Sequence, residues 1–289
     1  MIHVIIAGRA LPRPELLTPP VMQAEITQLL SYPIKSCGAL SHEQAEVTSL
    51  GLSADRQWML VDSNGLFMSQ RKHPSMALIQ PQLNGGTLLL NAPGMSAIEV
   101  PNDSSEATKV QVWNDHLLAS LSDAEVNQWL SQYLQNDVRL VRFGQYSQRL
   151  IDPDYAQAAE QVAFADGYPI LVTHEASLHT LNQQLSTAVN MSRFRPNVVL
   201  RTEAAAWAEN NWLQLSQADL TLDLVKPCGR CVMTGVEQSS GVQTGSEVLK
   251  TLKSQFAHQG KAVFGMNAIP RIKQQKVSLQ VGQSLQINQ

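Results

Sequence analysis

One stretch decides how this sequence folds: Lys226-Pro227-Cys228-Gly229-Arg230-Cys231-Val232-Met233-Thr234. An alternating run over residues 220–225 precedes it, and a second apolar run over residues 232–236 follows it. Alternation of apolar and polar residues is typical of a β-strand. We therefore expect both cysteines of the stretch to lie where one strand turns into another, with a thiol exposed for chemistry.

Four kinds of site fit such a Cys-x-x-Cys stretch. A zinc site needs a second Cys or His pair at ligand spacing, and neither Cys37 nor the seven histidines supply one. A thioredoxin-like dithiol needs its first cysteine at a helix N-terminus, whereas a β-branched strand is predicted to follow here. Two further interpretations have the parts they need. The thiols are buried and structural at a glycine turn, or one of them is a soft ligand or nucleophile that Arg230 assists.

Composition bounds the class of protein. The 289 residues are 44% hydrophobic and 16% charged, as in a globular protein of one large or two ordinary domains. The net charge of -3 offers no basic excess for many phosphates, which argues against a general nucleic-acid binder. Three cysteines suit a reducing compartment, so we expect a cytoplasmic protein. No apolar run approaches the roughly 20 residues of a membrane span, so we expect no membrane association.

Two domains are expected after a proline-rich extension. Residues 1–21 contain four prolines beside one short apolar patch, and we expect little regular structure there. The first domain is expected over residues 22–121. Short runs bounded by turn residues are typical of a small β-barrel or sandwich, and they lie at 24–30, 45–50, 55–62, 66–69, 77–83, 87–91 and 109–113.

A helix marks the start of the second domain, expected over residues 122–289. Ser122-Asp123-Ala124-Glu125 matches a capping box, and apolar residues recur on one face up to Gln135. We expect a second helix capped by Thr173, whose free N–H groups would suit an anion, and a last helix over residues 246–257. Strands are expected at 138–143, 170–172, 198–201, 220–225, 262–264, 277–281 and 285–287. The fold class is therefore mainly β with a few helices (α+β).

Cations and polar side chains gather at the expected strand ends. Lys35 and Ser36 follow the first strand as a pair that can hold a phosphate, although a solvated loop lysine is the commoner arrangement. Arg193, Arg195 and Asn197 precede another strand. The sequence contains no nucleotide-binding loop, Gly-x-Ser-x-Gly elbow or His-Glu-x-x-His motif. These residues favour a phosphate-bearing cofactor that meets a cysteine.

Six motifs together carry a family resemblance. They are Tyr32-Pro33-Ile34-Lys35-Ser36, Gly51-Leu52-Ser53-Ala54-Asp55-Arg56-Gln57-Trp58-Met59, Ser69-Gln70-Arg71, Phe164-Ala165-Asp166-Gly167-Tyr168-Pro169, Phe194-Arg195-Pro196-Asn197 and Cys228-Gly229-Arg230-Cys231. In this order they resemble the MOSC family with its N-terminal β-barrel partner domain, and within it YcbX-type bacterial proteins and the mitochondrial amidoxime reducing component. The resemblance runs from about Met22 to the C-terminus. It implies an N-terminal β-barrel domain, a C-terminal MOSC-type β-barrel domain and a molybdenum cofactor (molybdopterin) held between them.

The resemblance also implies roles for matched residues. Cys231 is the implied protein ligand of the molybdenum and, with Asp166 near the metal, is implied to be catalytic. Eight residues match positions that hold the pterin and its phosphate: Lys35, Ser36, Arg56, Arg71, Thr173, Arg195, Asn197 and Arg230. Arg193 is outside the shared pattern and counts only as a local charge. Pyridoxal phosphate binding is a further expectation at the level of the family.

The implied activity is the reduction of small N-hydroxylated compounds, such as hydroxylaminopurines, amidoximes and hydroxylamines. A thiolate and a dithiolene are soft ligands suited to a redox metal, and an open position can take up the substrate oxygen. YcbX-type proteins carry a C-terminal iron–sulfur domain, which needs four cysteines, and none follows Cys231 here. We therefore expect no iron–sulfur cluster in this chain, and electrons from a separate flavoprotein reductase or ferredoxin.

Two other functions stay open beside the reductase. Cys231 would also suit a sulfur carrier, in which it holds a persulfide and hands it to a metal centre. Alternatively, the protein binds and stores the molybdenum cofactor and catalyses nothing. A molybdenum assay separates the carrier from the cofactor enzyme, and turnover with an amidoxime separates an enzyme from a storage protein.

Overall fold

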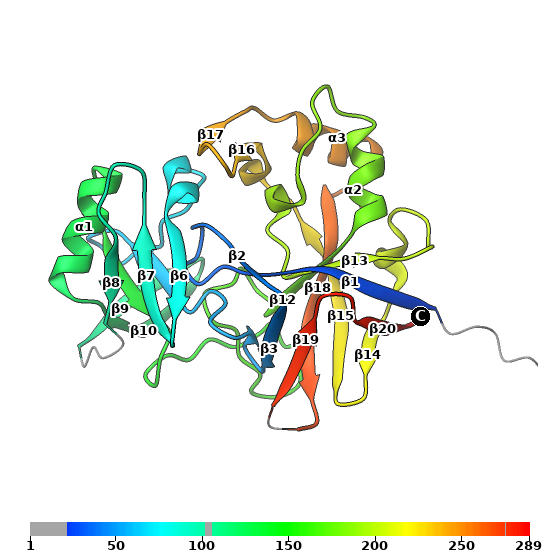
Figure 1. Cartoon of the computed structure of the whole chain (residues 1–289), viewed down its shortest axis with the longest axis horizontal. Helices are drawn as coiled ribbons and strands as arrows, with labels where there is room; N and C mark the ends of the chain where they lie inside the picture. Colours follow the sequence, from blue (N-terminus) through cyan, green and yellow to red (C-terminus); the bar gives the residue numbers. More distant parts are fainter. Residues whose placement is uncertain (1–21, 102–105, 275) are drawn as a thin grey trace, which may run out of the picture.

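The molecule has two parts that lie side by side along its long axis (Figure 1). The computed structural model describes residues 22–101, 106–274 and 276–289. The extension expected over residues 1–21 lies outside these residues. Strands predominate and three α-helices occur in the described part of the chain, which confirms the mainly β class.

The strands, in chain order, are β1 (Gln23–Ser31), β2 (Leu40–His42), β3 (Gln44–Thr48), β4 (Gly51–Leu52), β5 (Trp58–Val61), β6 (Gln80–Asn84), β7 (Thr87–Asn91), β8 (Ile98–Val100), β9 (Ala107–Val112), β10 (Asp115–Leu121), β11 (Arg139–Arg142), β12 (Ile170–His174), β13 (Val198–Arg201), β14 (Gln214–Gln217), β15 (Leu220–Gly229), β16 (Val236–Glu237), β17 (Val242–Gln243), β18 (Val263–Ile272), β19 (Val277–Gln280) and β20 (Ser284–Asn288). The α-helices are α1 (Ala124–Leu134), α2 (Glu175–Asn182) and α3 (Glu247–Gln255). The 3-10 helices are η1 (Pro74–Leu78), η2 (Met191–Phe194), η3 (Ala208–Asn211) and η4 (Val232–Gly235).

Seven strands close into a barrel in the order β13-β12-β18-β15-β14-β20-β1, because β1 also pairs with β13. Inward side chains of these strands form one apolar core that includes Ile26, Trp212 and Leu222. Antiparallel pairing sets Leu29 of β1 opposite Val198 of β13. The first strand of the chain therefore completes a barrel whose other six strands run from β12 to β20.

The other part contains a four-stranded sheet, β5-β11-β10-β9, and a three-stranded sheet, β6-β7-β8. Helix α1 packs Val126, Trp129 and Leu130 into one apolar cluster with these strands. The chain runs through this part from β5 to β11, whereas the first domain was expected over residues 22–121, a range that includes β1 and ends before α1 and β11. The difference arises because the partners of β1 and β11 are remote in sequence, and an alternating pattern does not say which strand pairs with which.

The capping box expected at Ser122 is wrong. Helix α1 begins at Ala124 after Asp123, and no side-chain hydrogen bond caps it. Asn127 anchors the helix instead. Its Nδ2 donates to the Ser122 carbonyl at 2.9 Å, and its Oδ1 accepts from the backbone N–H of Leu140 in β11 at 2.8 Å. These bonds fix α1 beside β11 and so within the first part of the molecule.

Three expected strands of the first part differ in the structure. Residues 66–69 make isolated bridges rather than a strand. The run at 77–83 begins as the 3-10 helix η1, because Pro74 favours the first turn of a helix, and β6 starts only at Gln80. The strand expected from Asp55 starts at Trp58, because Arg56 has φ of 47°, in the left-handed region.

The Cys-x-x-Cys stretch was expected to connect two full strands, but the structure differs. β15 continues to Gly229, and Cys231 precedes the 3-10 helix η4 as its N-cap residue. Thr234 closes the turn, because its backbone N–H and its hydroxyl both donate to the Cys231 carbonyl, at 3.1 and 3.0 Å. Two register shifts between β15 and β18 bend this end of the strand. Cys231 therefore lies in a turn beyond the sheet.

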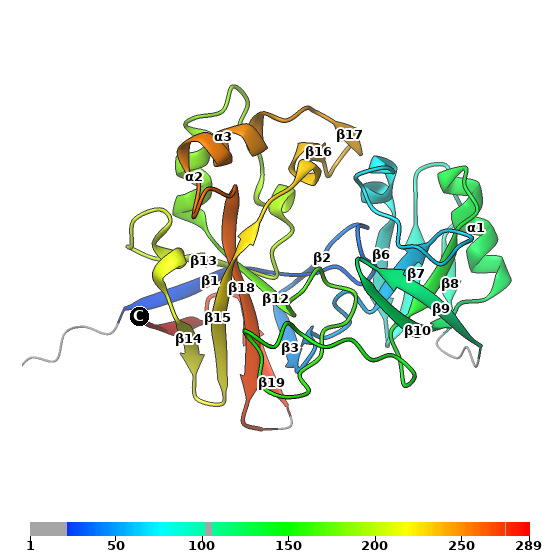
Figure 2. The ribbon, with the colours of Figure 1, turned by 180° about the vertical axis from the view of Figure 1, so that it is seen from behind.

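Thr173 does not cap a helix, contrary to expectation. It pairs with Val199 of β13, so β12 continues to His174 and α2 begins at Glu175. Helices α2 and α3 lie together above one end of the barrel (Figure 1). Seen from behind, the long connection between β11 and β12 runs from one part of the molecule to the other (Figure 2). This connection carries several residues of the site described next.

Candidate functional site

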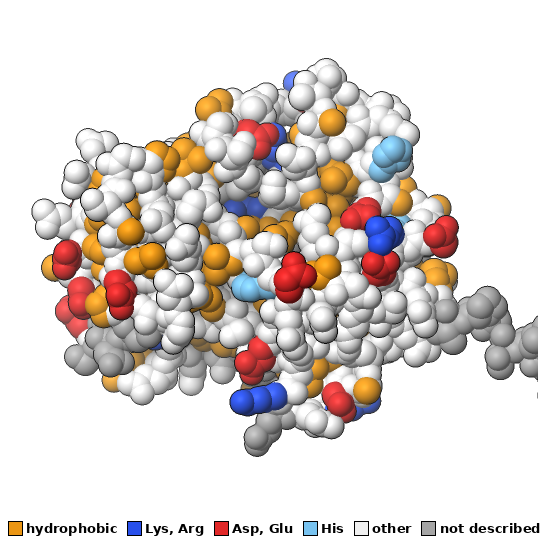
Figure 3. Space-filling view, in the orientation of Figure 1, with side chains coloured by type: hydrophobic (Ala, Val, Ile, Leu, Met, Phe, Trp, Pro, Cys, Tyr) orange, Lys and Arg blue, Asp and Glu red, His pale blue; other side chains and the backbone are white. Residues whose placement is uncertain are grey.

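A cavity of about 840 Å³ is lined by residues of both parts. Eight Lys and Arg side chains and three Asp side chains line it, although the whole chain has a net charge of -3. In the space-filling view, Lys and Arg side chains lie at the base of a hollow between the parts (Figure 3). A concentration of cations in a concave site favours an anionic ligand.

Most residues expected at the site line this cavity. They are Lys35, Ser36, Arg56, Arg71, Asp166, Arg195, Asn197, Arg230 and Cys231. Thr173 is fully buried in β12 and is not among the residues that line the cavity. The structure therefore brings together nine of the ten expected residues, which come from six separate segments of the chain.

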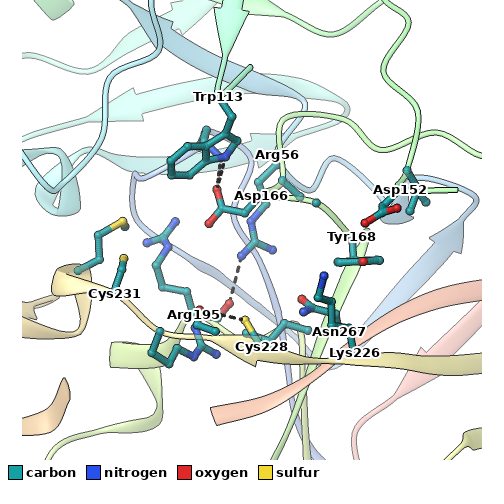
Figure 4. Close-up of a pocket in the computed structure, with 18 of the residues that line it drawn as sticks. Arg56, Trp113, Asp152, Asp166, Tyr168, Arg195, Lys226, Cys228, Cys231 and Asn267 are labelled. Carbon is teal, nitrogen blue, oxygen red and sulfur yellow. Dashed lines mark hydrogen bonds and ion pairs between the residues drawn. The ribbon is translucent and has the colours of Figure 1, made fainter. Parts of the chain in front are cut away.

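The two cysteines of the stretch both line the cavity but differ in their surroundings (Figure 4). Nη2 of Arg71 donates to Sγ of Cys231 at 3.3 Å. Burial raises the pKa of Cys228, which keeps that thiol protonated, and its Sγ donates to the Gly229 carbonyl at 3.9 Å. Cys231 is therefore the cysteine with a cationic hydrogen-bond donor.

Arg230, the expected partner of the thiol, has a different role. Its Nε and Nη2 donate to the Phe264 carbonyl at 3.1 and 2.8 Å, and its Nη1 donates to the Phe194 carbonyl at 3.1 Å. The guanidinium thus ties β18 to η2. The cation that reaches Cys231 is Arg71, from the other part of the molecule, which local sequence could not indicate.

Lys35 and Asp166 form an ion pair at the cavity wall. Nζ of Lys35 donates to Oδ1 of Asp166 at 2.5 Å and to the Phe164 carbonyl at 2.8 Å. The side chain of Lys35 is 6% exposed and that of Asp166 is 67% exposed, so the carboxylate faces the open space. Burial lowers the pKa of Lys35. Enclosure by the cavity walls would by itself raise the pKa of Asp166, but the Lys35 ammonium outweighs this effect and holds that pKa well below its usual range.

Arg56 and Arg195 both lie over the ring of Tyr32, with guanidinium carbons 4.3 and 4.1 Å from its centroid. Nη1 of Arg195 donates to the Cys37 carbonyl at 2.7 Å, whereas its buried Nη2 has no partner among the described residues. Burial lowers the pKa of Arg195 to about 10. A buried guanidinium nitrogen without an acceptor is costly, so this group is suited to a bound anion.

Three residues of the site have a left-handed backbone. The φ angles of Ser36, Arg56 and Arg195 are 67°, 47° and 55°. Such a conformation costs roughly 1 kcal/mol or more for a residue with a side chain, and it clusters at functional sites. Arg56 supports one of these residues, because its Nη2 donates to the Arg195 carbonyl at 3.1 Å. The strained backbone aims Ser36 and Arg195 at the same cavity.

The side-chain amide of Asn197 holds neighbouring segments of the site together. Its Oδ1 accepts from Nη1 of Arg56 at 2.9 Å and from the backbone N–H of Leu171 at 3.0 Å. Its Nδ2 donates to the Leu30 carbonyl at 3.1 Å. The amide thereby joins β1, β12 and a site arginine, and its polar atoms are used within the protein.

Trp113 and Arg149 line the cavity but were not expected at the site. Trp113 stands in the turn between β9 and β10, and its Nε1 donates to Oδ1 of Asp166 at 3.3 Å. Arg149 is 6% exposed and donates to Asp115 at 2.7 Å and to the Asp166 carbonyl at 3.1 Å. Trp113-Asn114 at the end of the strand expected over residues 109–113 was a possible signal of a tight turn, but nothing local linked Trp113 or Arg149 to Asp166.

A pair of glutamines also joins the two parts beside the site. Nε2 of Gln70 donates to Oε1 of Gln238 at 3.0 Å, and Nε2 of Gln238 donates back to Oε1 of Gln70 at 2.9 Å. Gln238 Oε1 also accepts from Nη1 of Arg195 at 3.2 Å. The pair therefore connects the cavity arginine to a loop of each part.

The residues present fit a molybdenum cofactor. Within the described residues, no three His, Cys, Asp or Glu side chains gather as a metal site, so a metal at Cys231 must bring further ligands with it. A dithiolene does so, and its phosphate needs donors such as Nη2 of Arg195 and the Ser36 hydroxyl. The volume of the cavity lies in the range usual for cofactor sites, roughly 300–1,000 Å³.

Comparison with known proteins gives two family matches. Residues 23–137 match the MOSC N-terminal beta barrel domain, and residues 159–286 match the MOSC domain. The chain is 33% identical over 245 residues to the mitochondrial amidoxime-reducing component 1 of Xenopus laevis. The aligned region covers 79% of this chain and 70% of the Xenopus protein. It is 32% identical over 242 residues to component 1 of Homo sapiens, an alignment that covers 79% of this chain and 71% of the human protein. It is also 32% identical over 262 residues to component 2 of Rattus norvegicus, an alignment that covers 83% of this chain and 77% of the rat protein. Among the described residues, no helix has both the length and the apolar character needed to cross a bilayer.

Proposed function

Because this chain belongs to the MOSC family and has amidoxime-reducing components among its relatives, we propose that it is a molybdenum cofactor-dependent reductase of N-hydroxylated compounds. The observation that carries the proposal is the Cys231 thiol on the wall of a cation-lined cavity, with an Arg71 nitrogen 3.3 Å from its sulfur. The reaction converts R–NH–OH, two electrons and two protons into R–NH2 and water. Hydroxylaminopurines, amidoximes and hydroxylamines are the proposed substrates.

Separate groups hold the two ends of the cofactor. Cys231 would ligate the molybdenum through its sulfur, and Arg195 and Ser36 would bind the phosphate with charge-assisted hydrogen bonds. When bound, the molybdenum centre supplies the two electrons and an open position for the substrate oxygen. Arg56 acts through Arg195, because it fixes the left-handed backbone of that residue.

Lys35 and Asp166 are the proposed proton source. The Lys35 ammonium uses two of its N–H groups on Phe164 and Asp166, which leaves one for the cavity. Because burial lowers the pKa of Lys35, its ammonium gives up a proton more readily than an exposed lysine does. The Lys35 ammonium holds the pKa of Asp166 low, so this carboxylate stays ionised and keeps the Lys35 proton beside the substrate.

The size and charge of the cavity favour a cofactor enzyme over a sulfur carrier. A persulfide adds one sulfur atom to Cys231, which requires neither a cavity of about 840 Å³ nor eight cationic side chains. A storage protein would need the same site and would differ only in turnover. The reductase is preferred because the exposed Asp166 carboxylate and the Lys35 ammonium provide proton transfer at the reactive end.

Two measurements on the full chain test the proposal. Protein purified from cells that make the molybdenum cofactor should contain molybdenum close to one atom per chain by elemental analysis. With reduced viologen as the electron source, it should convert an aromatic amidoxime into the amidine. Metal without turnover would indicate a storage protein, and a persulfide on Cys231 without metal would indicate a sulfur carrier.

Electrons are proposed to come from a separate protein. The chain has three cysteines, and an iron–sulfur cluster needs four cysteine ligands. NADH alone should not support turnover, whereas a flavoprotein reductase or ferredoxin from the same cell should, at a rate that falls as salt rises if docking is charge-steered. Efficient NADH oxidation by the isolated chain would contradict this source of electrons. We propose the cytoplasm as the location, which cell fractionation tests.

A further inference from the structure

Trp113 contacts both sides of the reactive end of the cavity. It lies between β9 and β10 with φ of 56°, and its side chain remains partly exposed. Its ring centroid is 4.9 Å from that of Phe67 and 4.6 Å from the guanidinium carbon of Arg71, and its Nε1 donates to Asp166 at 3.3 Å. In Figure 4 the indole lies directly above Asp166. These contacts, together with a strained turn, hold the ring in one place.

The first consequence concerns Arg71. Its guanidinium lies over the Trp113 ring and donates to Cys231 Sγ at 3.3 Å. Within the described residues, no carboxylate lies within 4 Å of Arg71 as an ion-pair partner, so the indole face and the sulfur are its nearest fixed partners. A cation over an indole face is worth about 0.5–2 kcal/mol, enough to select one direction for a flexible arginine. Trp113 therefore directs Arg71 onto the sulfur.

The second consequence concerns Asp166. Oδ1 of its carboxylate accepts from Nε1 of Trp113 and from Nζ of Lys35. Both donors use the same oxygen, which leaves Oδ2 for the open side of the cavity. The orientation of the carboxylate toward the reacting atoms thus depends on the indole N–H as well as on Lys35.

We propose that Trp113 is a positioning residue that holds Arg71 on the metal-ligand sulfur and Asp166 beside it, and that the Arg71–sulfur hydrogen bond sets the reduction potential of the centre. The proposal rests on the proposed function. A hydrogen bond from a cation draws electron density from a thiolate, which makes the sulfur a weaker donor and favours the reduced state of a metal it binds. Loss of that bond should therefore lower the midpoint potential.

Three variants separate the two contacts of Trp113. Trp113→Phe keeps an aromatic face under Arg71 but loses the N–H to Asp166. Trp113→Leu loses both, and Arg71→Met removes the donor to Cys231. Redox titration of the loaded protein, followed by electron paramagnetic resonance, should show a lower midpoint potential in Trp113→Leu and Arg71→Met, and no shift in Trp113→Phe. In Trp113→Phe, kcat should fall several-fold with little change in KM, because the displaced carboxylate acts in the chemical step.

Leu118→Ala is the matched control. Leu118 is 41% exposed on the neighbouring strand β10 and is not among the residues that line the cavity. The midpoint potential, kcat and KM of Leu118→Ala should equal those of the wild type. Circular dichroism verifies that every variant folds. If Trp113→Leu fails to fold, Arg71→Met and Trp113→Phe still decide the matter. Equal potentials in wild type and Arg71→Met would overturn this role alone, whereas a wild type that binds no molybdenum would overturn the proposed function and this role with it.

Discussion

The side-chain amides of Gln70 and Gln238 donate hydrogen bonds to each other, at 3.0 and 2.9 Å. Gln70 is fully buried, and Gln238 also accepts from Arg195. A reciprocal amide pair satisfies two donors and two acceptors at once, so removal of either partner leaves buried polar groups unpaired. This relationship links the stability of the interface between the two parts to the position of a cavity arginine.

A double-mutant cycle on this pair should show strong coupling. Gln70→Ala and Gln238→Ala should each lower the free energy of unfolding by about 1–3 kcal/mol, because each removes two hydrogen bonds from the other amide. The loss of unfolding free energy in the double variant should be smaller than the sum of the two single losses, by about 1 kcal/mol or more. Urea titration of the cofactor-free protein measures this, with exposed Gln148→Ala as control. Additive losses would mean that the two amides act independently.

The two cysteines of the stretch should differ sharply on substitution. Cys231→Ala should abolish amidoxime reduction and release the molybdenum, because it removes the sulfur to which Arg71 donates. Cys228→Ala should keep most of the activity, because burial raises the pKa of that thiol and leaves it a poor ligand. Metal content and turnover are measured on both. An equal loss in the two variants would indicate a dithiol site instead.

Arg195→Ala should weaken retention of the cofactor by roughly tenfold or more, since a charge-assisted hydrogen bond is worth about 1.5–3 kcal/mol. Its buried Nη2, which has no partner among the described residues, supplies that bond. Molybdenum content after extensive dialysis measures retention. Arg201→Ala, on the exposed end of β13, is the control and should retain the metal. Full occupancy in Arg195→Ala would remove this arginine from the site.

Tyr32 should make the folded state sensitive to alkali. Burial raises the pKa of Tyr32 to about 12, whereas an unfolded tyrosine ionises near pH 10. Between these values the unfolded chain loses a proton that the folded chain keeps, so stability present below pH 10 is lost as the pH rises, by about 1.4 kcal/mol per unit. Tyr32→Phe should therefore show a shallower loss than wild type in urea titrations from pH 9 to 12.

Two comparisons sharpen the alkaline experiment. Burial also raises the pKa of Cys37 to about 12, so part of the alkaline loss should persist in Tyr32→Phe. Tyr146→Phe, at a side chain that is 47% exposed, should follow the wild-type curve. At pH 7, Tyr32→Phe should be close to neutral in stability, because the buried hydroxyl has no partner among the described residues. A curve identical to wild type above pH 10 would contradict the raised pKa.

Local pattern predicted much of the secondary structure. The strand expected at 198–201 is β13, and the helix expected to end near Gln135 is α1, because both have buried residues at the spacing of their element. Pairing was less predictable. Nothing in the alternation of β1 identifies β13 and β20 as its partners, and nothing in the start of α1 indicates that Asn127 binds Leu140.

The site was predictable where short motifs bring residues to strand ends. Lys35, Asp166 and Arg195 line the cavity, as the family resemblance implied. The expected partner of the thiol was its sequence neighbour Arg230, but the structure places Arg71 there. Adjacent side chains in a bent strand point in different directions, so nearness in sequence does not give nearness in the site.

Closure of the barrel by β1 also constrains how the chain reaches its folded state. The ribosome completes β1 before its barrel partners β13 and β20 exist, so barrel closure must wait while more than half of the chain is made. A fragment that starts after β11 would lack β1, and its β13 and β20 would become bare edges with unpaired backbone groups. Such a fragment should associate with itself, and addition of a peptide of residues 22–31 should restore a monomer. The strand that closes the barrel therefore comes from the N-terminal family module, so we expect the two modules to fold as a single unit.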